Sequence, residues 1–152
     1  MKKILMALLV TGTIVSCKQP TGNIIVQKAP IDSLIINWNN SWNNHDSAAV
    51  RNLFTADALL IDDNLIAMNA NELSAKWISP NINAVNNLKA TQLQEWETNE
   101  RAGYTGKYQF DVLVKDSLIA QPRGVFTVNW KKTDNGDWKI MTATIHSFIE
   151  KK

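Results

Sequence analysis

The chain has 152 residues, of which 45% are hydrophobic and 20% are charged, a size and composition that suit a single hydrophobic core. Lys and Arg number 16 against 14 Asp and Glu, and no stretch gathers the basic residues together. The sequence therefore lacks the electrostatic footprint of a nucleic-acid-binding protein or of a basic membrane-surface patch.

The start of the chain has the order of a bacterial lipoprotein signal peptide. Lys2 and Lys3 precede a mostly apolar run, Ile4–Val15, which is shorter than the ~20 residues of a membrane-spanning helix. The run ends at Ser16-Cys17, which resembles a lipobox, and Cys17 is the sole cysteine of the chain. We predict that residues 1–17 are a signal peptide ending at a lipidated Cys17, with an ordinary secretory signal or a short membrane anchor as the alternatives.

Lipidation of Cys17 would hold the protein in the cell envelope of a bacterium, because two or more acyl chains, at about 0.8 kcal/mol per buried CH₂, anchor stably. Lys18 is not an acidic retention signal, which favours the periplasmic side of an outer membrane. Cleavage would remove Lys2 and Lys3 and leave equal numbers of basic and acidic residues, 14 of each. Residues 18–29 contain chain-breaking Pro and Gly and are predicted to form a tether, with a short packed strand at Ile24–Val26 as the alternative.

Helices precede strands in the rest of the chain. Pro30 suits the first turn of a helix, and apolar residues then recur at helical spacing through Trp42. Asp46 is expected to cap a second helix. Two short apolar strands are expected at 58–61 and 65–68.

A third helix is predicted over Asn71–Trp77, ending before Pro80 because proline breaks the helical hydrogen-bond ladder. Residues 81–87 are expected to be a loop that could serve as a flexible lid. The apolar period then changes to two, and Asn135-Gly136 favours a hairpin turn. The strands are predicted at 88–98, 104–115, 123–132 and 138–149. This order indicates an α+β fold, with a strongly bent antiparallel sheet around three N-terminal helices.

This layout resembles the nuclear transport factor 2-like superfamily, whose members form a cone-like α+β barrel. Within it, the chain is most similar to the SnoaL-like branch and to relatives known only as domains of unknown function. The resemblance implies a cone domain over residues 30–152. The fold hosts isomerases, cyclases, dehydratases, lipid binders and association modules, so it does not specify a function. The residues that carry the resemblance are Trp38, Trp42, Asn44-His45-Asp46, Leu53-Phe54, Ala56-Asp57-Ala58, Trp130-Lys131-Lys132 and Asn135 to Ile140.

Ketosteroid isomerase belongs to the same superfamily, and its pattern identifies Asp62 as the match of its catalytic base. Its oxyanion-hole tyrosine matches Trp38, which has no hydroxyl. Its second, protonated aspartate falls near Thr127 or Val128, and neither is acidic. Because that mechanism needs a base and two O–H donors, the resemblance does not favour steroid isomerisation here.

Asp62 and His146 are the candidate proton-transfer residues. Partial desolvation at the mouth of a cone would raise the pKa of Asp62 toward that of a useful base, although Asp62-Asp63-Asn64 also reads as a solvated turn. His146 is expected to point the same way as Trp138, as a catalytic group or as a core or rim histidine. Aromatic walls suit a flat or apolar ligand, and the pocket candidates, which could equally be core residues, are Trp38, Trp42, Trp77 and Trp96.

Two functions stay open at the sequence level. One is a lipid-anchored domain that binds a small apolar molecule or forms a homodimer through its sheet. The other is a cofactor-independent SnoaL-like enzyme of the isomerase, cyclase or dehydratase type that uses Asp62 or His146. The sequence has no zinc-ligand spacing, no Gly-rich phosphate loop and no Gly-x-Ser-x-Gly elbow, so we expect no metal and no nucleotide cofactor.

Overall fold

The computed structural model describes residues 28–148. The predicted signal peptide, nearly all of the predicted tether and the last four residues lie outside this range. Ala29 is 7% exposed, so the packing of the domain begins just before Pro30. Within residues 28–148, no helix combines the length and the hydropathy needed to cross a bilayer.

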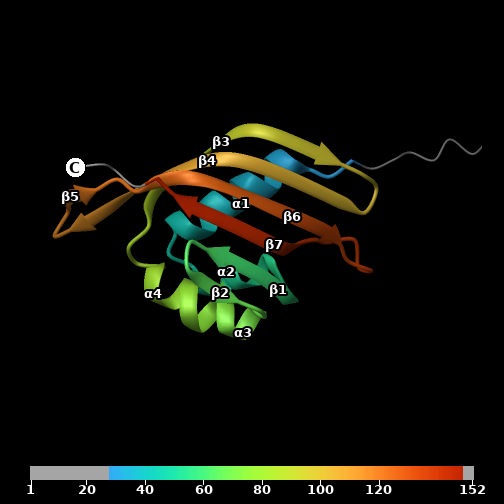
Figure 1. The fold of residues 1–152 in the computed structure, drawn as a ribbon, viewed down its shortest axis with the longest axis horizontal. Helices are drawn as coiled ribbons and strands as arrows, with labels where there is room; N and C mark the ends of the chain where they lie inside the picture. Colours follow the sequence, from blue (N-terminus) through green and yellow to red (C-terminus); the bar gives the residue numbers. More distant parts are fainter. Residues whose placement is uncertain (1–27, 149–152) are drawn as a thin grey trace, which may run out of the picture.

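The first two helices follow the sequence prediction. Helix α1 spans Ile31–Asn43 and α2 spans Ser47–Asn52. The Asp46 carboxylate caps α2 by accepting a hydrogen bond from the Ala49 backbone N–H at 2.8 Å. Helix α1 contains several Asn residues, which are weak helix formers, so the burial of its apolar face holds it against the long strands (Figure 1). That face contains Ile31, Ile35, Trp38 and Trp42.

The third helix is longer than predicted and changes type along its length. It consists of α3 (Ala70–Leu73), a π-helical segment η1 (Ser74–Ile78) and α4 (Ser79–Asn81). The expected end before Pro80 is wrong. The Ser79 N–H bonds the Ser74 carbonyl, which widens the turn and places Pro80 in the first turn of α4, where its missing N–H costs little.

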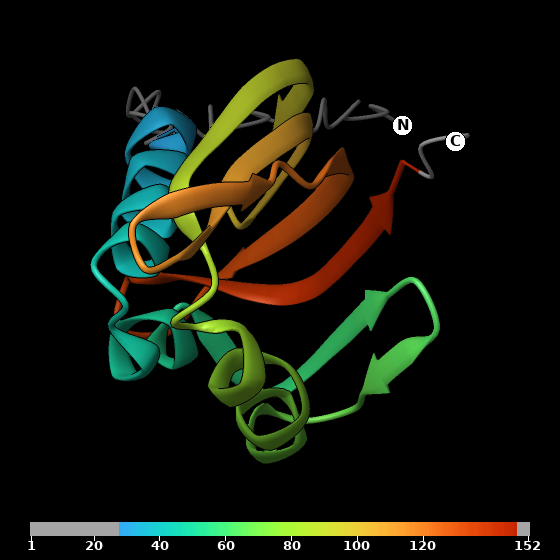
Figure 2. The ribbon, with the colours of Figure 1, turned by 90° about the vertical axis from the view of Figure 1, so that its left-hand side faces the viewer.

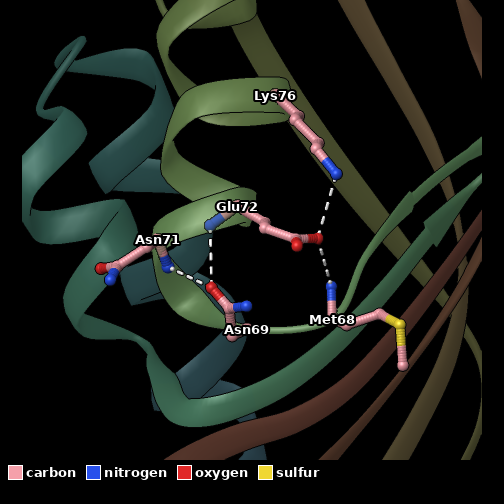
Figure 3. A network of polar contacts seen from close by, with 5 residues as sticks. All are labelled: Met68, Asn69, Asn71, Glu72 and Lys76. Carbon is pink, nitrogen blue, oxygen red and sulfur yellow. Dashed lines mark hydrogen bonds and ion pairs between the residues drawn. The ribbon is translucent and has the colours of Figure 1, made fainter.

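Polar contacts fix the start of this helix (Figure 3). The Asn69 Oδ1 accepts hydrogen bonds from the backbone N–H groups of Asn71 and Glu72, both at 3.0 Å. The Glu72 carboxylate accepts from the Met68 backbone N–H at 3.1 Å and from Lys76 Nζ at 3.0 Å. These bonds satisfy donors that an uncapped helix would leave unpaired, and so they position the segment that carries the tryptophan of η1.

The strands form one strongly curled sheet, as predicted (Figures 1 and 2). The order is β2-β1-β7-β6-β4-β3, with β5 paired to β4. Neighbours are antiparallel except β1 and β7, which pair in parallel. This parallel pairing and the short strand β5 were not predicted. The strands are β1 Phe54–Asp62, β2 Leu65–Ala67, β3 Asn86–Glu97, β4 Arg101–Val114, β5 Ser117–Ala120, β6 Arg123–Lys132 and β7 Trp138–Ser147.

Two register shifts decide which face of the sheet several side chains occupy. On β3, Gln92 pairs with Gly106 but Gln94 pairs with Thr105, which leaves Leu93 as an extra residue. On β7, Met141 is the extra residue in the pairing with β6. Because side chains alternate along a strand, each extra residue moves the residues beyond it to the opposite face.

The segment 81–87, predicted as a loop that could serve as a flexible lid, packs two apolar side chains into the core, Ile82 and Val85. Val85 is 7% exposed, and its carbonyl lies 3.1 Å from His45 Nε2. The Asn43 side chain pairs with the backbone of Leu88 in both directions, because Oδ1 accepts from the N–H at 2.6 Å and Nδ2 donates to the carbonyl at 3.1 Å. The last residue of α1 and the turn that follows it therefore fix the entry into β3.

Candidate functional site

A cavity of about 150 Å³ lies inside the cone. Helix α1, segment η1, α4, the segment that leads into β3 and the inner faces of β4, β6 and β7 line it, and β1 contributes its last residue. Its walls are mainly aromatic and aliphatic, with a few polar groups. The lining residues are Trp38, Trp42, Asp62, Trp77, Asn81, Ala84, Val85, Leu88, Tyr108, Phe110, Pro122, Phe126, Ile145 and Ser147.

Three of the tryptophans predicted to line a pocket, Trp38, Trp42 and Trp77, are both core and cavity wall. Each is at most 6% exposed. Trp77 packs edge-on against Trp42, with ring centroids 4.8 Å apart, and lies 6.1 Å from the ring of Trp38. The Trp42 Nε1 is buried and has no hydrogen-bond partner among the residues that the structure describes. The rings thus fill part of the cone and shape the space that remains.

Asp62, the candidate base, lies in the cavity wall. It is the last residue of β1, and its side chain is half-buried. The Asp62 Oδ2 accepts a hydrogen bond from Trp77 Nε1 at 2.7 Å. Burial raises the pKa of Asp62, and the neighbouring charge of Asp63 adds to this, while the bond from Trp77 acts in the opposite direction. Asp62 therefore has the environment expected of a proton-transfer group or of a ligand-orienting carboxylate, and not that of a solvated turn residue.

Tyr108 and Ser147 bring two hydroxyl groups to the same cavity, and neither was singled out from the sequence. Tyr108 Oη and Ser147 Oγ lie 3.0 Å apart. Burial raises the pKa of Tyr108, and the charges of Asp62 and Asp63 contribute to the same shift. Tyr108 stands in the alternating apolar pattern of β4, which was the available signal. A Cβ on Gly124 would approach Tyr108 Oη to 2.8 Å, so the lack of a side chain at this position makes room for the phenol.

Trp96, the fourth predicted pocket residue, lies elsewhere. It is 46% exposed and does not line the cavity. Its ring covers Gly103 on the outer face of the sheet, where a Cβ would collide with it. The extra residue Leu93 explains the difference, because Trp96 would share the inner face with Ala90 if β3 were regular.

His146, the second predicted proton-transfer residue, also faces outward. Its Nδ1 lies 2.9 Å from Asp63 Oδ1, and its side chain is 69% exposed. Hydrogen bonds from Ser147 are the main cause that holds the pKa of Asp63 below its usual range, with a smaller contribution from His146. The extra residue Met141 turns His146 to this face while Ile145 faces the cavity. His146 therefore contacts Asp63 on the outer face and does not reach Asp62 in the cavity.

Within the described range, no three His, Cys, Asp or Glu side chains gather as metal ligands would. Besides the indole N–H groups of its tryptophans, the cavity wall has the carboxylate of Asp62, the hydroxyls of Tyr108 and Ser147, and the amide of Asn81, which donates to the Trp77 carbonyl at 2.8 Å. The arrangement can hold a small, largely apolar molecule and can exchange one proton with it.

The sequence matches no family model and no curated protein. Solved structures, however, share its fold. A ketosteroid isomerase-like protein from Erwinia carotovora atroseptica is 14% identical, with a TM-score of 0.67 and coverage of 79% of this chain and 95% of that one. A nuclear transport factor 2-like superfamily protein from Salmonella enterica serovar Typhimurium is 12% identical, with a TM-score of 0.66 and coverage of 80% and 91%.

A protein of unknown function from Mycobacterium tuberculosis is 15% identical, with a TM-score of 0.68 and coverage of 79% of this chain and 70% of that one. At such identities the likeness establishes the fold and leaves function to the site. The fold predicted from the sequence is confirmed: this chain has the nuclear transport factor 2-like fold.

Proposed function

We propose that the domain binds a small, flat and largely apolar molecule inside the cone, with Asp62 as the polar group that orients it. The observation that carries the proposal is a half-buried carboxylate in the wall of an aromatic cavity. A cavity of about 150 Å³ holds a molecule of one or two rings. A steroid-sized ligand would require the tryptophan cluster to open.

A cavity-filling variant tests this proposal. Indole is titrated into the detergent-solubilised full chain, and binding is followed by saturation-transfer NMR. We expect Ala84→Phe to abolish binding, because Ala84 lines the cavity and a phenyl ring would occupy it. Ala48→Phe, on the exposed face of α2, makes the same chemical change away from the cavity and should leave binding unchanged. Equal binding by both variants would place the ligand elsewhere and refute the proposal.

A proton-transfer enzyme is the second candidate, and the raised pKa of Asp62 favours it. The Tyr108 hydroxyl supplies a donor in the same cavity, where the sequence match to ketosteroid isomerase had offered none. The simplest test is isomerisation of 3-cyclohexenone, a small β,γ-unsaturated ketone that needs a base and a donor. Turnover that disappears in Asp62→Asn would support the enzyme. Turnover that survives this change would exclude Asp62 as the base.

The proposal extends to the place where the domain works. Its support is the order of a basic pair, an apolar run and a single cysteine before residue 18. A lipid on Cys17 would hold the cone at the membrane surface in the cell envelope. The wild-type protein should partition into the detergent phase of a Triton X-114 separation, and Cys17→Ala should move it to the aqueous phase. Wild-type protein in the aqueous phase would contradict the anchor.

Self-association through the outer sheet face is a separate prediction, and light scattering of the solubilised chain tests it.

A further inference from the structure

The charge of the cavity wall is unbalanced. Asp62 is the one charged side chain that lines the cavity in residues 28–148, because Lys, Arg and His are absent from the lining. Its hydrogen bond comes from the neutral indole of Trp77. A half-buried carboxylate is normally matched by a cation or by several donors, since removing its charge from water is costly. Here the part of the chain that the structure describes supplies one neutral donor, the Trp77 indole.

A second negative charge reinforces the imbalance. Asp63 follows Asp62 directly, and its charge disfavours ionisation of Asp62. The His146 ring lies beside Asp63 on the exposed outer face of the sheet, on the far side from the cavity. The potential that a molecule meets inside the cone is therefore negative at the Asp62 end.

The remaining walls are suited to the same sign of charge. Aromatic faces carry partial negative charge and attract cations placed over them. Six aromatic residues of the lining surround a volume of about 150 Å³, and they are Trp38, Trp42, Trp77, Tyr108, Phe110 and Phe126. A cavity whose wall consists largely of aromatic rings and includes one carboxylate is chemically complementary to a compact organic cation.

We propose that the ligand of this cavity is a small organic cation, an amine or a quaternary ammonium compound, whose charge is balanced by Asp62 and by the aromatic walls. This inference rests on the proposed ligand-binding function and narrows its ligand class. A neutral ligand would displace water from Asp62 and leave the negative charge of the carboxylate unbalanced, with the neutral Trp77 indole as its donor. The Asp62 carboxylate would repel an anion. A cation would pair with this carboxylate, in a site where water screens the attraction poorly.

Matched probes separate charge from shape. Choline and 3,3-dimethylbutan-1-ol have nearly the same shape, but only choline is charged. Both are titrated into the detergent-solubilised full chain at neutral pH, with tryptophan fluorescence as the readout. We expect choline to bind at least about tenfold more tightly than the alcohol, as cation–π contacts and one ion pair imply.

Two variants complete the test. Asp62→Asn keeps the shape and an acceptor for Trp77, so it should reduce the preference for choline to about threefold or less, the share left to the aromatic walls, while the alcohol binds as before. Asp116→Asn removes an equal charge from the exposed turn between β4 and β5 and should keep the full preference. Near-UV circular dichroism checks that both variants are folded.

The outcomes distinguish the two proposals. If the alcohol binds as well as choline, or better, the cation inference is wrong and the apolar pocket stands. If the preference for choline persists in Asp62→Asn, the carboxylate is not its source and the inference is also overturned. If neither probe nor indole binds, the ligand-binding function itself fails.

Discussion

Asp62 and Asp63 are neighbours in the sequence and lie in opposite environments. The carboxylate of Asp62 faces the cavity and has a raised pKa because of burial. The carboxylate of Asp63 faces solvent, accepts hydrogen bonds from Ser147 and has a lowered pKa. The same contrast runs along the sheet, whose inner face is aromatic and whose outer face carries polar pairs such as Thr105–Thr127. Asp62 is the last residue of β1, whereas Asp63 begins the turn with a left-handed φ of 47°, so the end of the strand separates the carboxylate in the cavity from the one at the surface.

The largest expected effect compares two tryptophans on the two faces. Trp38→Ala should destabilise the domain by about 3–5 kcal/mol, because it leaves a cavity among rings that are closely packed. Trp96→Ala should cost about 1 kcal/mol, since its ring is half-exposed. Urea unfolding of both variants measures the difference. Similar losses would show that Trp96 is held as firmly as the inner residue and would weaken the contrast between the faces.

Two glycines, one beside the cavity and one on the outer face, provide a second comparison of the two faces of the sheet. A Cβ on Gly124 would meet the His146 carbonyl and the Tyr108 ring, so Gly124→Ala should cost about 1–3 kcal/mol through displaced backbone. The three atoms nearest to a Cβ on Gly103 all belong to the half-exposed ring of Trp96, which can swing away into solvent, so Gly103→Ala should cost about 1 kcal/mol or less. Thermal unfolding of both variants measures which substitution costs more stability. A larger loss of stability for Gly103→Ala would show that the outer position is the more tightly packed of the two.

Hydroxyl pairs on the two faces should differ by less. Tyr108→Phe leaves Ser147 Oγ without its partner beside the cavity, with an expected cost of about 1 kcal/mol. Thr127→Val removes the partner of Thr105 on the outer face, where water can replace it, and should cost about 0.5 kcal/mol or less. Denaturant midpoints of both variants, measured in parallel, decide the order.

The smallest effect is a difference in sign with pH. The pKa of Asp62 is raised above its ordinary 3.8, so its contribution to stability is present below that value and is lost as pH rises through the folded pKa. The pKa of Asp63 is lowered, so its contribution is present above 3.8 and is lost as pH falls through the folded pKa. In the wild-type protein, Asp62 lowers the stability as the pH rises, and Asp63 raises it. Asp62→Asn should therefore abolish the first change with pH, and Asp63→Asn should abolish the second.

Unfolding measured from pH 3 to pH 7 tests both signs. The two variants should deviate from the wild-type profile in opposite directions. Deviations of the same sign would mean that the carboxylates share one environment, and the distinction between cavity and surface would then fail at this strand end.

Local chemistry made much of the fold predictable. Asp46 caps α2 through its own side chain, and the apolar stripe of α1 and the strand at 123–132 follow from the spacing of neighbouring residues. The helix end predicted from Pro80 was wrong, because a π-helical turn precedes this proline and places it in the first turn of α4. The β1–β7 pairing joins segments that are far apart in the chain, and no local pattern encodes it.

For the site, the sequence by itself determined the fold and the kinds of residue available to it, which are aromatic side chains for the cone and a carboxylate after the first apolar strand. Tertiary structure decided which of these residues meet. One extra residue on β3 turned Trp96 outward, and one on β7 turned His146 outward, while Tyr108 and Ser147 took places in the cavity. The physical reason is that side chains alternate with a period of two, so a single inserted residue reverses the face of every residue after it, and pairing between strands fixes where the insertion falls.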